Sequence, residues 1–79
     1  MRTIIIYRSS EANYTPESLL LSYAKTAPGH GFRSDRDGKI FLRIESSYYE
    51  YDHWDIEHTD KYTDCVTVYL KEAEKGDTK

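Results

Sequence analysis

The chain has 79 residues, of which 11 are Lys or Arg and 14 are Asp or Glu, so its formal net charge is −3 with neutral histidines. A chain of this length forms one small domain and leaves no room for a second. The single cysteine excludes an internal disulfide scaffold. No apolar run approaches the roughly 18 residues of a membrane-spanning helix, and the N-terminus lacks the pattern of a signal peptide. We therefore expect a reduced, cytoplasmic domain over residues 1–72, followed by a charged tail over 73–79.

The first expected element is a strand over residues 2–8. Its residues are mostly β-prone, and they include three consecutive isoleucines, Ile4, Ile5 and Ile6. Successive side chains of a strand point to opposite faces, so the three cannot share one face. We therefore expect this strand to be covered on both faces or to lie in the centre of a sheet.

A helix is predicted to begin at Thr15-Pro16-Glu17, because this sequence supplies a hydroxyl cap, a proline for the first turn and an acid near the positive end of the helix dipole. An apolar stripe with helical spacing follows, and Pro28-Gly29 is predicted to end the helix after about three turns. The stripe consists of Leu19, Leu20, Tyr23, Ala24 and Ala27. A single helix with one apolar stripe needs a sheet to cover it.

A β-hairpin is predicted over residues 32–44, around Asp37-Gly38. A two-residue loop would place Leu42 opposite a charged residue, Arg33, on the core face. A three-residue loop over 36–38, with Gly38 in the left-handed region, instead pairs Leu42 with Phe32. We favour the three-residue loop, since a one-residue slip would turn every side chain to the other face.

Two further strands are predicted, over residues 48–58 and 64–71, with a bend at Ser46-Ser47 and a turn at 59–61. The first of them has no cleanly apolar face, so we expect it either to change face near Asp52 or to lie at a sheet edge. The second should place Val66, Val68 and Leu70 inward. The predicted fold class is α+β, with one helix on a four- to five-stranded, largely antiparallel sheet in the order β-α-β-β-β-β.

Charge and aromatic residues are concentrated between Glu45 and Asp64. This segment holds seven carboxylates against the single cation Lys61, and five of the eleven aromatic residues of the chain. Residues 1–44 carry an excess of cations instead. An acidic segment rich in tyrosine and tryptophan is the strongest anomaly in the sequence.

The sequence contains no motif that predicts catalysis or a cofactor, and we expect neither an enzyme nor a metal site. His53 and His58 are five residues apart, which puts them on opposite faces of a regular strand, where they cannot share an ion. Gly29-His30-Gly31 lacks the residues of a phosphate-binding loop. Cys65 has no basic neighbours in the sequence that would make its thiol reactive.

The acidic segment is predicted to be a protein-binding surface. Its rings supply rigid contact area, and its carboxylates favour a partner with a basic, nucleic-acid-binding surface. The expected partner-binding residues are Tyr48, Tyr49, Glu50, Tyr51, Asp52, Trp54, Asp55, Glu57, Asp60 and Asp64. Any of these that lie in the interior must be removed from the set.

Three alternatives remain open at this stage, and the weakest of them is an uncharacterised metal-dependent enzyme. The first is a small regulator that binds nucleic acid through the basic hairpin, with Arg33, Arg36, Lys39 and Arg43 as its contacts. The second is that the carboxylates only keep an edge strand soluble. Against nucleic-acid binding, acids among the rings would repel phosphates. A homodimer is compatible with the small core and a partly apolar edge strand.

In size, acidity and absence of a catalytic motif, the chain resembles the small phage-encoded inhibitors of bacterial defence, above all the anti-CRISPR proteins. The likeness rests on the Glu45–Asp64 segment and on composition along the whole chain. Some proteins of that group occupy the DNA-binding groove of a CRISPR effector complex with an acidic surface that mimics DNA. The resemblance implies an inhibitor in the host cytoplasm, and it transfers no role to an individual residue.

Overall fold

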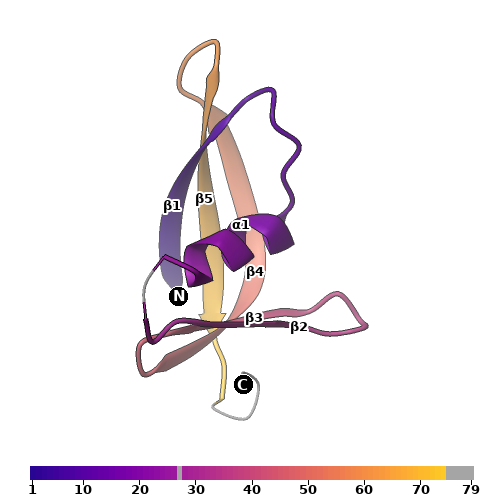
Figure 1. Ribbon diagram of the computed structural model, residues 1–79, viewed down its shortest axis with the longest axis vertical. Helices are drawn as coiled ribbons and strands as arrows, with labels where there is room; N and C mark the ends of the chain where they lie inside the picture. The colour runs from indigo at the N-terminus through magenta and orange to yellow at the C-terminus, as the bar shows by residue number, and fades with distance from the viewer. Residues whose placement is uncertain (27, 75–79) are drawn as a thin grey trace.

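The computed structural model describes residues 1–26 and 28–74, which form one helix and a five-stranded sheet (Figure 1). The strands are β1 (Arg2–Ser9), β2 (Gly31–Ser34), β3 (Ile40–Ile44), β4 (Ser47–His58) and β5 (Thr63–Glu72), and the helix is α1 (Pro16–Ala24). The sheet order is β1-β5-β4-β3-β2, and every neighbouring pair is antiparallel. The predicted fold class and element order are therefore confirmed for this part of the chain.

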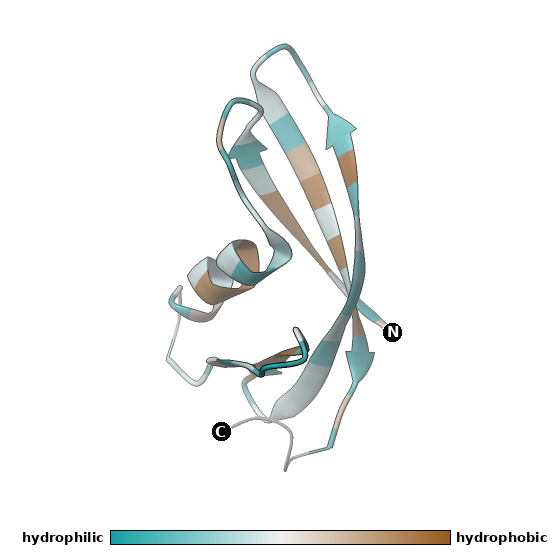
Figure 2. Cartoon of the chain, turned by 90° about the vertical axis from the view of Figure 1, so that its right-hand side faces the viewer, coloured by the Kyte–Doolittle hydropathy of each residue, from teal (hydrophilic) through white to brown (hydrophobic). Residues whose placement is uncertain are grey.

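One face of the sheet carries the core, and α1 lies on that face (Figure 2). Leu19 and Leu20 of the helix are fully buried there against side chains from β1, β3, β4 and β5. The strand members of this core are Ile4, Ile6, Ile40, Leu42, Ile44, Tyr49, Val66, Val68 and Leu70. We call this face the helix side and the other, which no helix of the described residues covers, the open face.

The predicted helix start is correct in detail. Thr15 accepts a hydrogen bond from the Ser18 backbone, the Ser18 hydroxyl accepts one from the Thr15 backbone, and Pro16 is in the first turn. The predicted end is wrong, because the helix stops at Ala24. The backbone and hydroxyl of Thr26 both bond to the carbonyl of Tyr23, which tightens the last turn. Ala27, the last residue of the predicted stripe, lies outside the described residues.

The hairpin register is also confirmed. Phe32 pairs with Leu42 and Ser34 pairs with Ile40, which leaves residues 36–38 as a three-residue loop. The Asp35 carboxylate accepts backbone hydrogen bonds from Asp37 and Lys39 inside that loop. Gly38 has a φ of 81°, as the predicted turn requires.

We expect Gly38→Ala to lower the free energy of unfolding by about 1 kcal/mol, because an alanine is strained at this φ. Apart from the adjacent residues, no described atom lies within 4 Å of the position where the added Cβ would be, so the cost comes from backbone strain and not from a clash. Gly38→Asn should lose less, since Asn tolerates the left-handed region. Urea denaturation of the three proteins measures the difference, and equal stability of the Ala and Asn variants would contradict the argument.

The prediction for the first strand is wrong. β1 lies at an edge of the sheet, and its only strand neighbour among the described residues is β5. Ile4 and Ile6 point into the core, whereas Ile5 is 59% exposed on the open face. The three isoleucines therefore reflect one buried face and one exposed apolar position, and not two covered faces.

Candidate functional site

A β-bulge in β4 determines which acidic side chains reach the open face. Tyr51 pairs with Leu70 and His53 pairs with Tyr69, so Asp52 is the extra residue between them. This insertion reverses the alternation of the strand. Tyr49 and Tyr51 precede the bulge on the helix side, whereas Asp55 and Glu57 follow it on the open face. The predicted change of face near Asp52 is confirmed. β4 lies between β5 and β3, but β3 pairs only with residues 47–50 of it. Among the described residues, residues 51–58 therefore have β5 as their one strand neighbour, so this half of β4 also forms a sheet edge, as the alternative expected.

The strand pairing brings these two acids beside aromatic and apolar residues from β1 and β5. Asp55 is opposite Thr67, which is opposite Ile5, and Glu57 is opposite Cys65, which is opposite Tyr7. Ile5 and Tyr7 are 59% and 61% exposed. We define the acidic open-face patch as Ile5, Tyr7, His53, Asp55, Glu57 and Tyr69.

Contacts within the patch fix its central rings. The His53 ring stacks on the Tyr69 ring, with 4.3 Å between centroids and 7° between planes. His53 also makes a hydrogen bond with the Asp52 carboxylate at the bulge. A hydrogen bond with Asp55 raises the pKa of Tyr69, and the negative charge of that carboxylate acts in the same direction. The patch therefore offers a partly pre-ordered aromatic surface beside two exposed carboxylates.

The ten predicted partner-binding residues do not lie on one surface. Four belong to the helix side: Tyr49 and Asp64 are buried, and Tyr51 and Trp54 are half-buried against the core. Tyr49 and Asp64 are accordingly removed from the set. Asp52 lies at the bulge, and Asp60 lies in the turn before β5, where it accepts the backbone N–H of Tyr62. The open face carries the other four, Tyr48, Glu50, Asp55 and Glu57.

The opposite end of the open face is basic and more tightly packed. The guanidinium of Arg33 lies 4.4 Å from the centre of the Phe41 ring, which is buried although it points away from the core. Glu50 forms an ion pair with Lys71 at 3.6 Å. The Nε atom of Arg43 is buried and has no hydrogen-bond partner among the described residues.

The predicted basic hairpin is thus divided. Arg33 and Arg43 lie half-buried in the strands, and Arg33 covers the Phe41 ring. Arg36 and Lys39 are exposed at the turn. The exposed cations at the hairpin tip are the part of this candidate site that can reach a phosphate.

Asp64 has a structural role on the helix side. The residue is 4% exposed, and its carboxylate accepts a hydrogen bond from the Tyr14 hydroxyl at 2.6 Å and makes another with the exposed His58 ring. The Tyr14 bond lowers the pKa of Asp64, burial opposes this shift, and His58 supports it. Tyr14 also meets Trp54 edge to face, with 5.7 Å between ring centroids. This cluster holds the loop before α1 against the sheet.

The lowered pKa predicts a stability change in acid. A carboxyl whose pKa is depressed in the folded state stabilises the fold above the unfolded value of 3.8, and this contribution is lost as the pH falls through the folded value. We expect Tyr14→Phe to be less stable than wild type at pH 7, with the difference shrinking below about pH 4. Thermal melts from pH 7 to pH 2 measure it, and a constant difference over that range would contradict the assignment.

No cluster of three or more His, Cys, Asp or Glu side chains that could hold a metal ion occurs within 1–26 and 28–74. In the same ranges, no helix is long and apolar enough to cross a membrane.

Sequence reasoning missed Ile5, Tyr7, His53 and Tyr69 as members of the patch. The outward direction of Tyr69 was readable from the alternation of its strand. The position of β1 beside β5 was not, because nothing local to residues 2–9 specifies which strand they pair with.

No family model matches the chain, and neither the curated proteins nor the solved structures contain a match to it.

Proposed function

We propose that this protein is a small, non-enzymatic binding protein whose acidic open-face patch covers the basic, nucleic-acid-binding surface of a protein partner. The observation that carries the proposal is that Ile5 and Tyr7 are exposed on the same face as Asp55 and Glu57. Only β5 lies between the two pairs. A large exposed apolar group beside charged groups is typical of a protein contact.

The chemistry of the patch favours a basic partner. Two exposed carboxylates attract cationic side chains, speed association and reject acidic competitors. The same carboxylates repel the phosphates that a nucleic acid would bring to this face. A protein surface that normally binds nucleic acid offers the arginines and lysines that the patch lacks.

The resulting activity would be inhibition, since a partner whose basic surface is covered cannot hold its nucleic acid. This mode matches the resemblance to anti-CRISPR proteins, and a CRISPR effector complex is one partner of the required kind. The cytoplasm of the host cell is where such a partner would be met.

The alternative function is nucleic-acid binding through the hairpin tip, which the exposure of Arg36 and Lys39 favours. Two charges at a turn give a small basic footprint, and the described hairpin offers no exposed stacking ring beside them, since Phe41 is buried. The acidic patch therefore remains the better-supported surface.

Affinity capture from host cells distinguishes the two functions. Tagged wild-type protein is compared with Asp55→Asn/Glu57→Asn and with Arg36→Gln/Lys39→Gln, each with and without nuclease treatment. We expect a nucleic-acid-binding protein, free of nucleic acid, to be recovered by the wild type and the hairpin variant and lost by the patch variant. Recovery of nucleic acid itself, dependent on Arg36 and Lys39, would reverse the assignment.

A further inference from the structure

Among the described residues, no strand pairs with the outer edge of β1. Arg2 to Ser9 pair with β5 in a register that continues to Ser10, whose N–H donates to the carbonyl of Tyr62 at 2.9 Å. Along an antiparallel strand, the backbone N–H and C=O groups of alternate residues form hydrogen bonds with the neighbouring strand, and those of the residues between point away from it. The backbone groups of Ser10 point to β5, so those of the even-numbered residues of β1 do as well. The N–H and C=O groups of Thr3, Ile5 and Tyr7 therefore point to the free edge.

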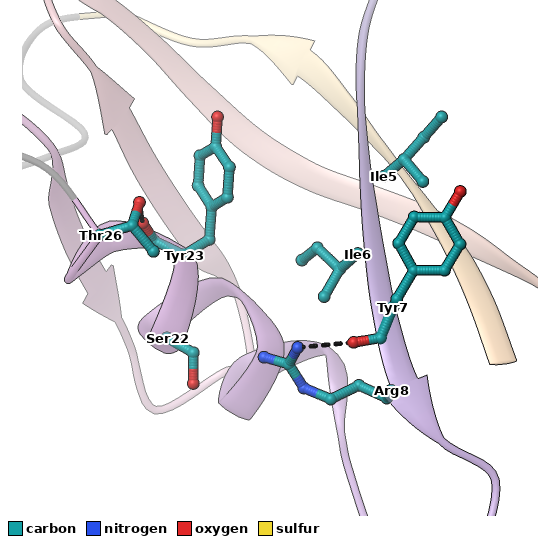
Figure 3. Close-up of a pocket in the computed structure, with 7 residues that line it drawn as sticks. All are labelled: Ile5, Ile6, Tyr7, Arg8, Ser22, Tyr23 and Thr26. Atoms are coloured by element: carbon teal, nitrogen blue, oxygen red, sulfur yellow. Dashed lines mark hydrogen bonds between the residues drawn. The ribbon is translucent and has the colours of Figure 1, made fainter. Parts of the chain in front are cut away.

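A groove runs between this edge and the end of α1 (Figure 3). It has a volume of about 270 Å³ and is lined by Ile5, Ile6, Tyr7, Arg8, Ser22, Tyr23 and Thr26. Ile6 and the Tyr23 ring form its apolar walls, and Ser22 of the helix and Thr26 after it add aliphatic hydroxyls. An extended segment laid against β1 would direct alternate side chains into this groove and onto the open face.

Arg8 places a positive charge in the groove. The Arg8 side chain bends from β1 toward α1, and its Nη1 atom donates to the carbonyl of Tyr7 at 2.9 Å (Figure 3). No acidic group within 4.0 Å of Arg8 is found in residues 1–26 and 28–74. The Arg8 guanidinium thus donates to the Tyr7 carbonyl, which an added strand would need as an acceptor. A carboxylate would bind the guanidinium more strongly than this carbonyl does.

We propose that the β1 edge and this groove form a docking site for an extended acidic peptide segment of a partner protein, which adds to the sheet as a sixth strand. Backbone bonds to Thr3, Ile5 and Tyr7 hold the segment, a small apolar side chain fills the groove, and an acidic side chain draws Arg8 away from the Tyr7 carbonyl. The proposal goes beyond the function above, because it rests on backbone groups and on the helix-side groove and not on Asp55 or Glu57.

Charge favours such a segment over a second copy of this chain. In the antiparallel pairing of two β1 strands centred on Ile5, Arg2 of one copy lies opposite Arg8 of the other, on the same face. Two cations directly opposite each other repel. A strand with an acidic residue at the position opposite Arg8 replaces that repulsion with an ion pair.

The probe is a fluorescent hexapeptide, Glu-Val-Xaa-Val-Val-Thr, with blocked ends and Ala, Val or Leu as the third residue. Paired antiparallel to β1, it sets Glu opposite Arg8 and the third residue opposite Ile6, facing the groove. Its second and fourth residues exchange hydrogen bonds with Tyr7 and Ile5. N-methylation of those two residues removes the bonds, and N-methylation of the third residue, whose N–H points away, is the matched control.

Fluorescence anisotropy should show saturable binding of at least one of the three peptides below about 1 mM. We expect binding to weaken about tenfold or more when Glu is replaced by Lys, or on N-methylation of residues two and four, and to be unchanged in the control peptide. Arg8→Glu should reverse the preference, so that the Lys peptide binds better.

Ile5→Pro removes an outward N–H while leaving the bonds between β1 and β5 in place, and it should abolish binding without lowering the melting temperature by more than a few degrees. Absence of binding by all three peptides would overturn the proposal. An affinity that is unchanged by N-methylation at residues two and four would also overturn it. Concentration-dependent dimerisation that Ile5→Pro abolishes would assign the edge to a second copy instead.

Discussion

Leu20→Ala should remove a large share of the free energy of unfolding. Leu20 is fully buried, and it and Leu19 are the two fully buried residues of α1, with Tyr23 and Ala24 packed partly buried against the same core. Truncating a buried leucine costs about 2–5 kcal/mol. A chain of this size has a stability of roughly 4–12 kcal/mol, so the loss takes a large share. Urea denaturation followed by circular dichroism measures it.

Leu21→Ala is the matched control for this prediction. Leu21 is the next residue along the helix, undergoes the same chemical change and is 38% exposed. We expect it to cost about 1 kcal/mol or less, because part of its surface already contacts water. Equal destabilisation by the two substitutions would mean that α1 does not hold the sheet through Leu20.

Charge reversal in the patch should have the largest effect on partner binding. Asp55→Lys/Glu57→Lys changes the charge of the open face by four units and sets cations against the basic surface of the partner. We expect the affinity to fall by about 100-fold or more, because close charge pairs across interfaces contribute about 1.5 kcal/mol or more each. Titration calorimetry with the captured partner measures the change.

Glu11→Lys/Glu72→Lys controls for net charge. It produces the same total change at two exposed positions outside the patch, one in the loop after β1 and one at the end of β5. This variant should bind within about threefold of wild type, since exposed charges farther than a Debye length of about 8 Å are largely screened. If both variants lost binding equally, the long-range charge of the molecule and not the patch would be responsible.

Local chemistry in the sequence was enough to predict the helix start and the hairpin register. Thr15 and Pro16 act within one turn, and the pairing of Leu42 with Phe32 follows from keeping apolar side chains on one face. These features depend on residues a few positions apart. The order of elements follows from the same short-range patterns.

The acidic site could be predicted only in part, because it depends on pairings between distant residues. The bulge at Asp52 turns Asp55 and Glu57 to the open face, and the position of β1 beside β5 brings Ile5 and Tyr7 to them. The run of three isoleucines is equally compatible with a central strand. Tyr49 and Asp64 are residue types that often lie at the surface, yet both are buried. Tyr49 packs in the core, and Asp64 accepts the hydrogen bond from Tyr14.

Displacement of nucleic acid from the captured partner tests the central claim most directly. A labelled oligonucleotide is bound to the partner, and its fluorescence anisotropy is followed as wild-type protein is added. The account predicts stoichiometric release by wild type and by Arg36→Gln/Lys39→Gln, and none by Asp55→Lys/Glu57→Lys. A ternary complex that retains the oligonucleotide, or release that depends on Arg36 and Lys39, would contradict it.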